Sequence, residues 1–284
     1  MRRAPLRAAA VLSFAPLISG CAARMPARVI DVHEHWSFAE GAGGGGTDAA
    51  SQALSAEWER AGIVGAVVHL PSGTSQPAGP EPSARFCAGV GEEPDLAALE
   101  AALAQGAVSC LKVYLGYVHL YPDDARYRQV YELAERFRVP VVFHTGDTST
   151  ADALLKYADP LLVDEVAVEH RGVTFVIAHC GNPWLASAAE VAYKNPNVYL
   201  ECSALMTGNM DELPRATVDR YVTDAISYVL GYVEDPSKLM FGSDWPLVDL
   251  PAYVRAYARA VPREHWEAVF YGNAVRVFGF GGGE

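Results

Sequence analysis

Eight short apolar runs recur along the chain from residue 27 onward, and they constrain its fold more than any other feature. The runs are nearly continuously hydrophobic and rich in Val, Ile and Leu, as expected for parallel strands that are covered on both faces. Segments with helical periodicity lie between many of the runs, among them residues 95–106, 125–138, 186–195 and 218–233. The apolar runs occupy residues 27–36, 62–71, 84–91, 107–116, 139–147, 172–181, 197–205 and 238–246.

This alternation predicts an α/β fold, namely a (β/α)8 TIM barrel formed by a single domain. Such a barrel typically needs about 250 residues, and the chain has 284 residues. An open, doubly wound sheet is the alternative that the same alternation allows. Because no low-complexity linker divides residues 27–284, we expect one domain there.

The charge of the chain argues against polyanionic partners. It carries 22 lysines and arginines against 34 aspartates and glutamates, for a formal net charge of -12. A surface this acidic repels nucleic acid and anionic lipid, and no long basic run offsets it. We therefore expect the protein to act on a small-molecule substrate and not to bind nucleic acid. The charge predicts nothing about the oligomeric state.

The first twenty residues have the features of a targeting segment. A basic start, MRRAPLR, precedes an apolar stretch, AAAVLSFAPLIS, that is too short to span a bilayer as a helix. The stretch ends in LISGC, which resembles the lipobox of bacterial lipoproteins, in which cleavage leaves Cys21 as the lipid-modified first residue. We therefore expect a signal peptide at residues 1–20, a tether at 21–26 and a lipid-anchored protein of the bacterial cell envelope. The alternative is a cytoplasmic protein whose translation starts at Met25.

Four further cysteines lie inside or at the ends of the apolar runs. They show no CxxC spacing and do not have the pattern of a disulfide framework. We expect them to be free, buried thiols, and oxidation to disulfides in an exported protein is the alternative. They are Cys87, Cys110, Cys180 and Cys202.

A glycine-rich segment, GAGGGG at residues 41–46, contains a formal GxGxxG pattern. A dinucleotide site would also need an acidic residue at the end of the next strand. The next predicted strand ends in His69, Leu70 and Pro71 instead. We therefore expect a flexible loop over the active site.

Polar residues gather where the predicted strands end. In a TIM barrel the catalytic residues lie at the carboxyl ends of the strands. Lys112, His144 and His179 follow one another at intervals of about one βα unit, which places them on neighbouring strands. Five of the eight histidines fall at such ends, together with one lysine and two acids. In chain order these residues are His33, His35, His69, Lys112, His144, His179, Glu201 and Asp244.

The first predicted strand ends in the sequence His-Glu-His. Residues i and i+2 of a strand share a face, so His33 and His35 should point the same way while Glu34 points the other way. Two imidazoles side by side can bind one metal ion. A hydrogen-bonded histidine beside a solvated one is the alternative for this stretch alone, and the polar residues at the other strand ends favour the metal site.

These positions resemble the amidohydrolase superfamily, which carries His-x-His after strand 1, His on strands 5 and 6, and Asp after strand 8. The segments GSDWP around Asp244 and VFYGNAVRVFG at residues 269–279 are similar to the amidohydrolase 2 (amidohydrolase-related) family. The resemblance covers roughly residues 27–280. It implies that a divalent ion, with Zn²⁺ the first choice, is held by His33, His35, His144 and Asp244.

The resemblance also implies catalytic roles at the same place. Asp244 would accept the proton of an attacking water. His179 would either hydrogen-bond that water and the polarised carbonyl or bind a second metal ion. Lys112 would either be carbamylated and bridge two ions or stay cationic and bind a substrate carboxylate, and we expect the cationic form with one ion.

Other strand-end residues are expected to line the pocket. His69 and Glu201 are candidates for substrate contact. Three tyrosines after strand 4 would either line the pocket or lie exposed in a loop. They are Tyr114, Tyr117 and Tyr121.

An enzyme is the function that the resemblance implies. The first hypothesis is a metal-dependent hydrolase that directs a metal-activated water at an amide, ester or lactone. The alternative is a metal-dependent, non-oxidative decarboxylase of the same family, in which Lys112 would hold the leaving carboxylate. A non-catalytic, lipid-anchored binding protein is the third hypothesis, and it would not need a metal together with an additional strand-end acid and base. The identity of the substrate does not follow from the sequence.

Overall fold

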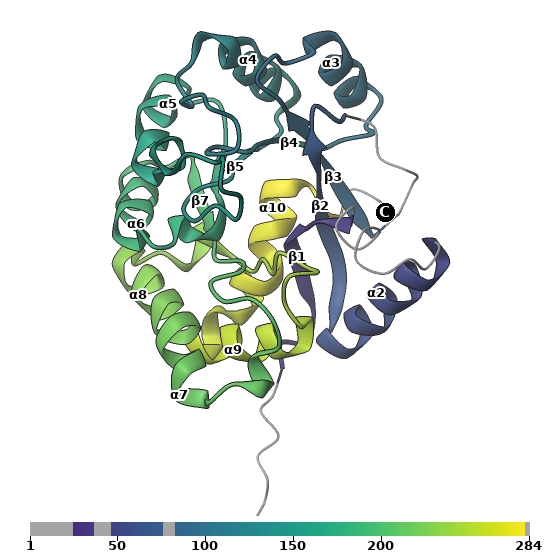
Figure 1. Cartoon of the computed structure of the whole chain (residues 1–284), viewed down its shortest axis with the longest axis vertical. Helices are drawn as coiled ribbons and strands as arrows, with labels where there is room; N and C mark the ends of the chain where they lie inside the picture. The colour runs from purple at the N-terminus through teal and green to yellow at the C-terminus, as the bar shows by residue number, and fades with distance from the viewer. Residues whose placement is uncertain (1–24, 37–46, 76–82, 282–284) are drawn as a thin grey trace, which may run out of the picture.

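The eight predicted strands are all present, and they pair in parallel in chain order. The computed structural model describes residues 25–36, 47–75 and 83–281 (Figure 1). Strand order runs from β1 to β8 without reversal, which is the order of a TIM barrel and not of a doubly wound sheet. The prediction of a single-domain barrel is therefore confirmed. The strands are β1 (Val29–Glu34), β2 (Ile63–Ser72), β3 (Ala84–Val90), β4 (Cys110–Val113), β5 (Val141–Phe143), β6 (Phe175–Ile177), β7 (Val198–Glu201) and β8 (Leu239–Met240).

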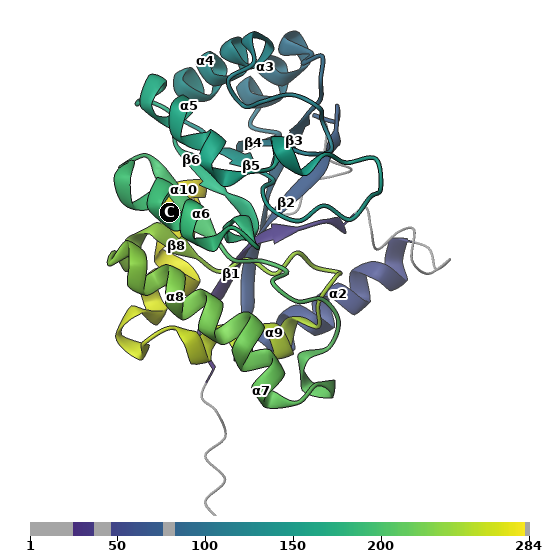
Figure 2. The ribbon, with the colours of Figure 1, turned by 60° about the vertical axis from the view of Figure 1, so that its left-hand side comes forward.

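Helices surround the strands, as Figures 1 and 2 show from two sides. The four helical segments expected from periodicity are present, the first as α3 and the last as part of α7 and α8. The helices are α2 (Thr47–Ala61), α3 (Leu96–Ala104), α4 (Arg128–Phe137), α5 (Val163–Glu169), α6 (Leu185–Lys194), α7 (Arg215–Val218), α8 (Asp224–Val233), α9 (Leu250–Ala260) and α10 (Asn273–Phe278). Single helical turns connect them at η1 (Ala125–Tyr127), η2 (Leu155–Tyr157), η3 (Pro160–Leu162), η4 (Ala178–Gly181), η5 (Met210–Glu212), η6 (Asp219–Thr223), η7 (Pro236–Lys238), η8 (Arg263–His265) and η9 (Ala268–Gly272).

Two hydrophobic cores hold the barrel together. The larger core lies between the strands and the outer helices. The smaller core fills the inside of the barrel with residues such as Ile30, Val67 and Val142, and α10 contributes Ala274 and Phe278 to it. Figure 1 shows α10 beside β1, inside the ring of outer helices. Because this apolar layer occupies the inside of the barrel, polar side chains are left to its carboxyl-terminal mouth.

The barrel is nearly closed by contacts between β1 and the residues that follow β8. The amide of His35 donates to the carbonyl oxygen of Trp245 at 2.8 Å. The buried carboxylate of Asp31 accepts a hydrogen bond from the amide of Ser243 at 2.9 Å. These bonds bring the first and last strands side by side, and they place His33 and His35 next to Asp244.

The cysteines correct one prediction. Cys87 and Cys110 form a disulfide, and so do Cys180 and Cys202, whereas we expected four free thiols. The partners lie about one βα unit apart in sequence, which hides the pairing from spacing rules. In the barrel, Cys87 and Cys110 are register partners on the adjacent strands β3 and β4, with Cα atoms 4.3 Å apart. Cys180 and Cys202 follow the ends of the adjacent strands β6 and β7.

Thiol labelling tests both disulfides. In a chain that starts at Met25 and therefore lacks Cys21, we expect no labelling by iodoacetamide after unfolding without reductant. After reduction, mass spectrometry should find label on Cys87, Cys110, Cys180 and Cys202. Each bridge closes a loop of 22 or 23 residues, so removing one should lower the free energy of unfolding by about 3 kcal/mol. Full labelling before reduction would contradict the pairing.

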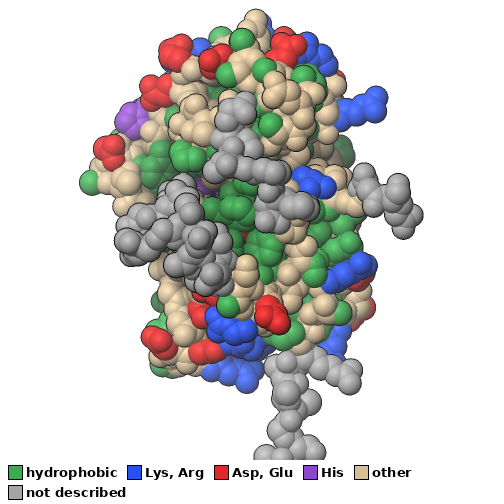
Figure 3. All heavy atoms as spheres, turned by 90° about the vertical axis from the view of Figure 1, so that its right-hand side faces the viewer, with side chains coloured by type: hydrophobic (Ala, Val, Ile, Leu, Met, Phe, Trp, Pro, Cys, Tyr) green, Lys and Arg blue, Asp and Glu red, His purple; other side chains and the backbone are tan. Residues whose placement is uncertain are grey.

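Several sequence-based expectations lie outside the described residues. These are the signal peptide, the lipid attachment at Cys21 and the glycine-rich segment at residues 41–46. Among the helices that are described, none is both long and apolar enough to cross a bilayer. Figure 3 shows one face of the molecule, on which hydrophobic side chains gather near the middle.

Candidate metal centre

The side chains of the site continue the inner face of the barrel by the two-residue period of a strand. Along β2, β4 and β5, each polar residue stands two positions beyond an apolar residue of the inner core. Residues i and i+2 share a face, so the polar side chains form a layer above the apolar one. The pairs are Val67 with His69, Cys110 with Lys112, and Val142 with His144.

A bulge in β1 brings both of its histidines into this layer. Between Asp31 and Glu34, β1 advances by one residue more than β2 does. Bulges re-aim side chains and are common next to active sites. The prediction that His33 and His35 point the same way is confirmed, because their Nε2 atoms lie 3.1 Å apart.

The side chain of Glu34 points away from the site, as predicted. Its carboxylate accepts hydrogen bonds from the indole Nε1 of Trp36 at 2.6 Å and of Trp58, on α2, at 2.9 Å. Glu34 is fully buried. Burial is the largest cause of a shift that raises the pKa of this carboxyl group well above the ordinary value. Glu34 therefore ties β1 to α2 and takes no part in the site.

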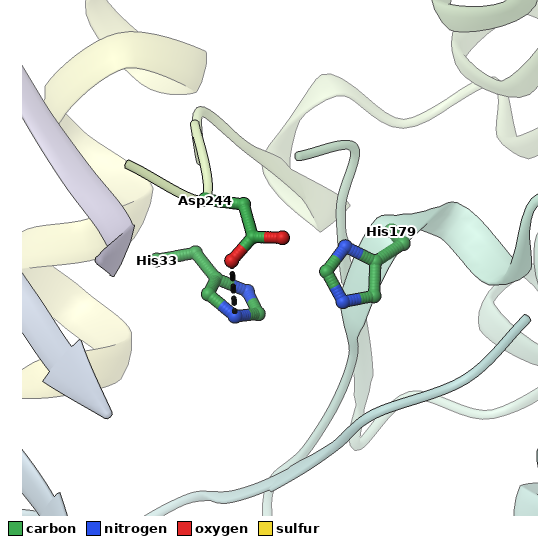
Figure 4. Close-up of side chains that lie close together, drawn as sticks. All are labelled: His33, His179 and Asp244. Carbon is green, nitrogen blue, oxygen red and sulfur yellow. Dashed lines mark ion pairs between the residues drawn. The ribbon is translucent and has the colours of Figure 1, made fainter. Parts of the chain in front are cut away.

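Three donor atoms converge at the mouth of the barrel. Asp244 Oδ1 lies 3.5 Å from His33 Nε2 and 3.4 Å from His35 Nε2. This oxygen is buried and has no hydrogen-bond partner among the described residues. His33, Asp244 and His179 each place a ligand atom within 4.8 Å of the other two. Figure 4 shows the carboxylate of Asp244 facing His33, with the His179 ring opposite.

Two of these residues have unusual backbone conformations. His179, in η4, has φ of 58°, and Asp244 has φ of 68°. Non-glycine residues seldom adopt this left-handed region, and such strain persists where the surrounding structure enforces it, often at functional sites. In Asp244 the conformation is held by its amide, which donates to the carbonyl oxygen of His33 at 2.8 Å.

Glu201 orients His33 from behind. Its Oε1 lies 2.6 Å from His33 Nδ1, and its Oε2 accepts a hydrogen bond from the amide of Ser203 at 2.7 Å. With a carboxylate at Nδ1, that nitrogen carries the proton, and Nε2 presents its lone pair to the site. Glu201 was expected in the pocket, but it is fully buried and does not line the cavity.

A glycine beside Glu201 makes this arrangement possible. A Cβ on Gly242 would lie 2.6 Å from Glu201 Oε2 and 3.2 Å from His33 Cβ. No side chain fits at that distance, so the glycine of the GSDWP segment leaves room for the carboxylate that orients His33.

Ser203 is a site residue that sequence reasoning missed. Its Oγ lies 2.8 Å from His179 Nδ1 and 3.4 Å from His33 Nδ1. It stands two positions after Glu201 and so shares its face, which is the one signal in the sequence that points to it. Ser203 leaves Nε2 of His179 directed toward the other imidazoles.

His144 and His179 form a pair next to the three donor atoms. His179 Nε2 lies 3.0 Å from His144 Nδ1, and His144 Nε2 lies 2.9 Å from the carbonyl oxygen of Asp147. The structure therefore brings His179 close to His33 and Asp244, and it places His144, the expected fourth ligand, one hydrogen bond further away.

His69 supports His33 and does not reach the cavity. Its ring centroid lies 4.3 Å from that of His33, and its Nε2 lies 3.1 Å from the carbonyl oxygen of Val32. It is 1% exposed and does not line the cavity, in contrast to the expectation of substrate contact.

Burial keeps the imidazoles of the site neutral. Burial lowers the pKa of His35 and of His144 to about 3. It lowers the pKa of His33 and of His179 well below the ordinary value. Burial is the largest cause of all four shifts, and the charge of Lys112 acts in the same direction. A neutral imidazole is the form that binds metal. The donor set is thus in its ligating state near neutral pH.

Lys112 is the one cation inside the described part of the barrel mouth. It is fully buried, and its Nζ has no hydrogen-bond partner among the described residues. Burial lowers its pKa to about 8, while the charges of Glu201 and Asp244 act in the opposite direction. Burial likewise raises the pKa of Glu201 to about 7 and of Asp244 to about 6, and Lys112 opposes both shifts.

A cavity of about 540 Å³ opens above the donor atoms. His35, His144, His179 and Asp244 lie at its polar end. Such a volume is that of a typical small-molecule site. Tyr114 and Tyr117 line the cavity, which is one of the two predictions made for these tyrosines. Tyr121 follows the other prediction, because it does not line the cavity and is 40% exposed.

Replacing Glu201 with glutamine tests how it orients His33. An amide can present its NH₂ group to His33 Nδ1 and so favour the wrong tautomer, and loss of such a partner costs about 10- to 100-fold in metal affinity. We expect that decrease when Zn²⁺ binding is measured by competition with a chelator. Glu165→Gln, on the exposed surface of α5, is the matched control. Equal affinities for the two variants would show that Glu201 does not orient the ligand.

Solved structures with the same fold include both hydrolases and decarboxylases. An uncharacterized TIM-barrel protein from Bordetella bronchiseptica is 19% identical, with a TM-score of 0.63, over 89% of this chain and 98% of that one. A probable 2-pyrone-4,6-dicarboxylic acid hydrolase from Acinetobacter baumannii, with citric acid bound, is 14% identical, with a TM-score of 0.61, over 89% and 100%. A dihydroxybenzoic acid decarboxylase from Polaromonas sp. JS666, with bound manganese and an inhibitor, is 13% identical, with a TM-score of 0.60, over 89% and 97%.

At these identities the likeness shows the shared fold alone. No curated protein sequence matches the chain significantly. The model of the family described as Amidohydrolase matches residues 30–280, which include every strand and every donor atom of the candidate metal centre. The chain therefore belongs to the amidohydrolase family.

Proposed function

We propose that the protein is a metal-dependent hydrolase of an ester, a lactone or an amide. The observation that carries the proposal is the triangle of His33 Nε2, His35 Nε2 and Asp244 Oδ1, whose sides are 3.1, 3.5 and 3.4 Å. Two ligand atoms on a tetrahedral zinc ion lie about 3.3 Å apart. Neutral imidazoles beside a carboxylate oxygen that has no hydrogen-bond partner among the described residues fit such an ion.

The fourth protein ligand comes from the pair of His144 and His179. Both line the cavity beside Asp244. His144 is the ligand that the family pattern implies, and His179 is the imidazole closer to His33 and Asp244. The metal content of His144→Ala and His179→Ala decides between them, since removal of the ligand should release more metal than removal of its neighbour.

Three imidazoles and a carboxylate suit Zn²⁺, with Mn²⁺ the next candidate because a structural neighbour holds it. When bound, the ion supplies Lewis acidity that polarises a carbonyl and lowers the pKa of a water. Asp244 accepts the proton of the attacking water and delivers it to the leaving group. If His144 is the ligand, His179 Nε2 donates a hydrogen bond to the substrate carbonyl. If His179 is the ligand, His144 only helps to position it, because the one proton of neutral His144 is donated from Nε2 to the carbonyl oxygen of Asp147. Glu201 and Ser203 hold the rings in place.

We propose one ion per chain, with two as the alternative. Lys112, as an ammonium group, repels a second cation, and a second ion would need its carbamate as a bridge. Metal analysis of the purified chain is the direct measurement. A ratio near one supports the proposal, and a ratio near two supports a carbamylated Lys112.

Decarboxylation by the same residues is the alternative reaction. It needs a cation to hold the leaving carboxylate, which was the role considered for Lys112. Among the described residues, neither Lys112 nor any other lysine or arginine lines the cavity. The lining therefore favours hydrolysis.

A paired screen tests the proposed reaction. The chain from Met25, loaded with Zn²⁺ or Mn²⁺, is assayed against esters, lactones and amides for acid release, and against aromatic carboxylates for carbon dioxide release. We expect metal-dependent acid release that is lost on chelation. Carbon dioxide release without hydrolysis would establish the decarboxylase. Full activity in a metal-free preparation would exclude both metal-dependent hydrolysis and metal-dependent decarboxylation.

We also propose that the protein is exported and lipid-anchored through Cys21. The basic and apolar leader that ends in LISGC supports this location. The two disulfides add support, because disulfides persist mainly in oxidising compartments outside the cytosol. Cys21→Ser should release the protein from the membrane fraction of the bacterium. Wild-type protein found wholly in the cytosol with Met25 as its first residue would refute the proposal.

A further inference from the structure

The walls of the cavity lack positive charge. Among the described residues, the lining includes neither lysine nor arginine. A substrate carboxylate far from the donor atoms would therefore have no cationic partner among the described residues that line the cavity.

Lys112 does not change this conclusion, because it does not line the cavity. Its Nζ is 5.4 Å from the centroid of the Tyr114 ring, and Tyr114 lines the cavity where Lys112 does not. Lys112 is fully buried. Lys112 therefore offers no exposed ammonium group to a ligand in the cavity.

The two tyrosines of the wall present their rings, because the protein occupies their hydroxyl groups. Tyr114 donates a hydrogen bond to the carbonyl oxygen of Leu70 at 2.7 Å. The Tyr117 hydroxyl accepts from the amide of Ser149 at 2.9 Å and lies 3.1 Å from the Ser149 Oγ. The Tyr117 ring also packs edge-to-face on His144, with centroids 4.9 Å apart.

Three aliphatic side chains and three hydroxyl side chains complete the wall. Pro71 lies near the end of β2, Val118 in the loop after β4 and Leu247 in the loop after β8. The hydroxyl side chains are those of Ser72, Ser149 and Thr150. Val118 is buried and Leu247 is 42% exposed. The cavity therefore has a polar end, formed by the histidines and Asp244, and a mainly apolar body, formed by aromatic and aliphatic side chains with three hydroxyl side chains among them.

We propose that the cavity takes an uncharged, flat ring compound whose ester or lactone carbonyl reaches the polar end, so that the substrate class is aryl esters and small aromatic lactones. This inference rests on the proposed hydrolase function. Aromatic rings stack or pack edge-on against Tyr114 and Tyr117. A carboxylate on the same ring would lose its hydration without gaining a cationic partner among the described lining residues, and the net charge of -12 would repel it further.

Matched ligands test the charge preference without turnover. The uncharged ketone 2-tetralone has the shape of the lactone 3,4-dihydrocoumarin and cannot be hydrolysed. We expect calorimetry on the zinc-loaded chain to show that it binds about tenfold more tightly, or better, than its ring-carboxylated derivative. Equal or tighter binding of the carboxylated compound would overturn the proposed substrate class.

Turnover of the corresponding lactones gives the second readout. We expect kcat/KM for 3,4-dihydrocoumarin to exceed that for its ring-carboxylated counterpart by about tenfold or more. Preferred turnover of the carboxylated lactone would refute the substrate class and leave the hydrolase intact. Absence of metal-dependent turnover of any ester, lactone or amide would refute the hydrolase, and the binding comparison would still report on the cavity.

A variant that adds the missing cation makes the test specific to the wall. Leu247→Lys places an ammonium group at the cavity rim, where the partly exposed side chain leaves room for it. We expect the preference for the uncharged ligand to shrink by about tenfold or to reverse. Leu213→Lys adds the same charge at a residue that is 38% exposed and does not line the cavity, and it should leave the preference unchanged. The same change in both variants would assign the preference to the overall charge and would contradict the role of the wall.

Discussion

Asp244→Asn is expected to lower kcat by about 10²- to 10⁴-fold while the protein keeps its fold and much of its metal. The asparagine amide has the same shape and can still offer an oxygen where Asp244 Oδ1 lies, 3.4 Å from His35 Nε2. It cannot accept the proton of an attacking water. The loss should therefore appear in turnover more than in metal binding.

The substitution is suited to this position because of its backbone. Asp244 has φ of 68°, and asparagine tolerates the left-handed region as well as aspartate does. An alanine there would add backbone strain to the loss of the carboxylate. The asparagine variant thus separates the chemistry of the side chain from the stability of the loop.

Metal content, melting temperature and kcat for the best ester or lactone are the three measurements. Asp249→Asn is the matched control, since Asp249 caps the N-terminus of α9 through the amide of Ala252 and asparagine can make the same hydrogen bond. Turnover near that of the wild type in Asp244→Asn would place the base elsewhere, and His179 would be the next candidate.

The positions of most site residues could be predicted because they follow from strand periodicity. When a strand places an apolar residue in the inner core, the residue two positions later points to the same side and lies at the mouth of the barrel. Val142 and His144 are such a pair. The order of strands in a barrel then makes residues from successive units neighbours. His33, His35, His179 and Asp244 were brought together on this reasoning, and the structure has them within a few ångströms of one another.

The roles of individual side chains depend on contacts that periodicity does not contain. Glu201 was expected in the pocket, and its place behind His33 depends on Gly242, whose lack of a side chain leaves room for the carboxylate. The pairing of His144 with His179 depends on the left-handed backbone at His179. A local strand pattern does not encode such backbone departures.

The disulfides were missed for a related reason. Spacing rules for cysteines apply to small scaffolds, in which the bridges define the fold. In this barrel the strands bring Cys87 next to Cys110, and the pairing follows from register on β3 and β4. Once the strand order is assumed, equivalent positions on adjacent strands are the signal that would have found the bridge between Cys87 and Cys110, whereas Cys180 and Cys202 lie beyond the ends of β6 and β7.

His35→Ala is expected to have the other large effect, which is loss of most of the bound metal and, with it, of nearly all activity. His35 Nε2 lies 3.1 Å from His33 Nε2 and 3.4 Å from Asp244 Oδ1, so its removal takes away one corner of the triangle that fits an ion. Zinc content after dialysis and the affinity for added Zn²⁺ are the measurements, with His265→Ala, in η8 and outside the cavity lining, as the control. If excess Zn²⁺ restores part of the turnover, the defect lies in binding the ion. A variant that keeps full metal and full turnover would show that the triangle is not the metal site, and the proposed mechanism would then fail at its first step.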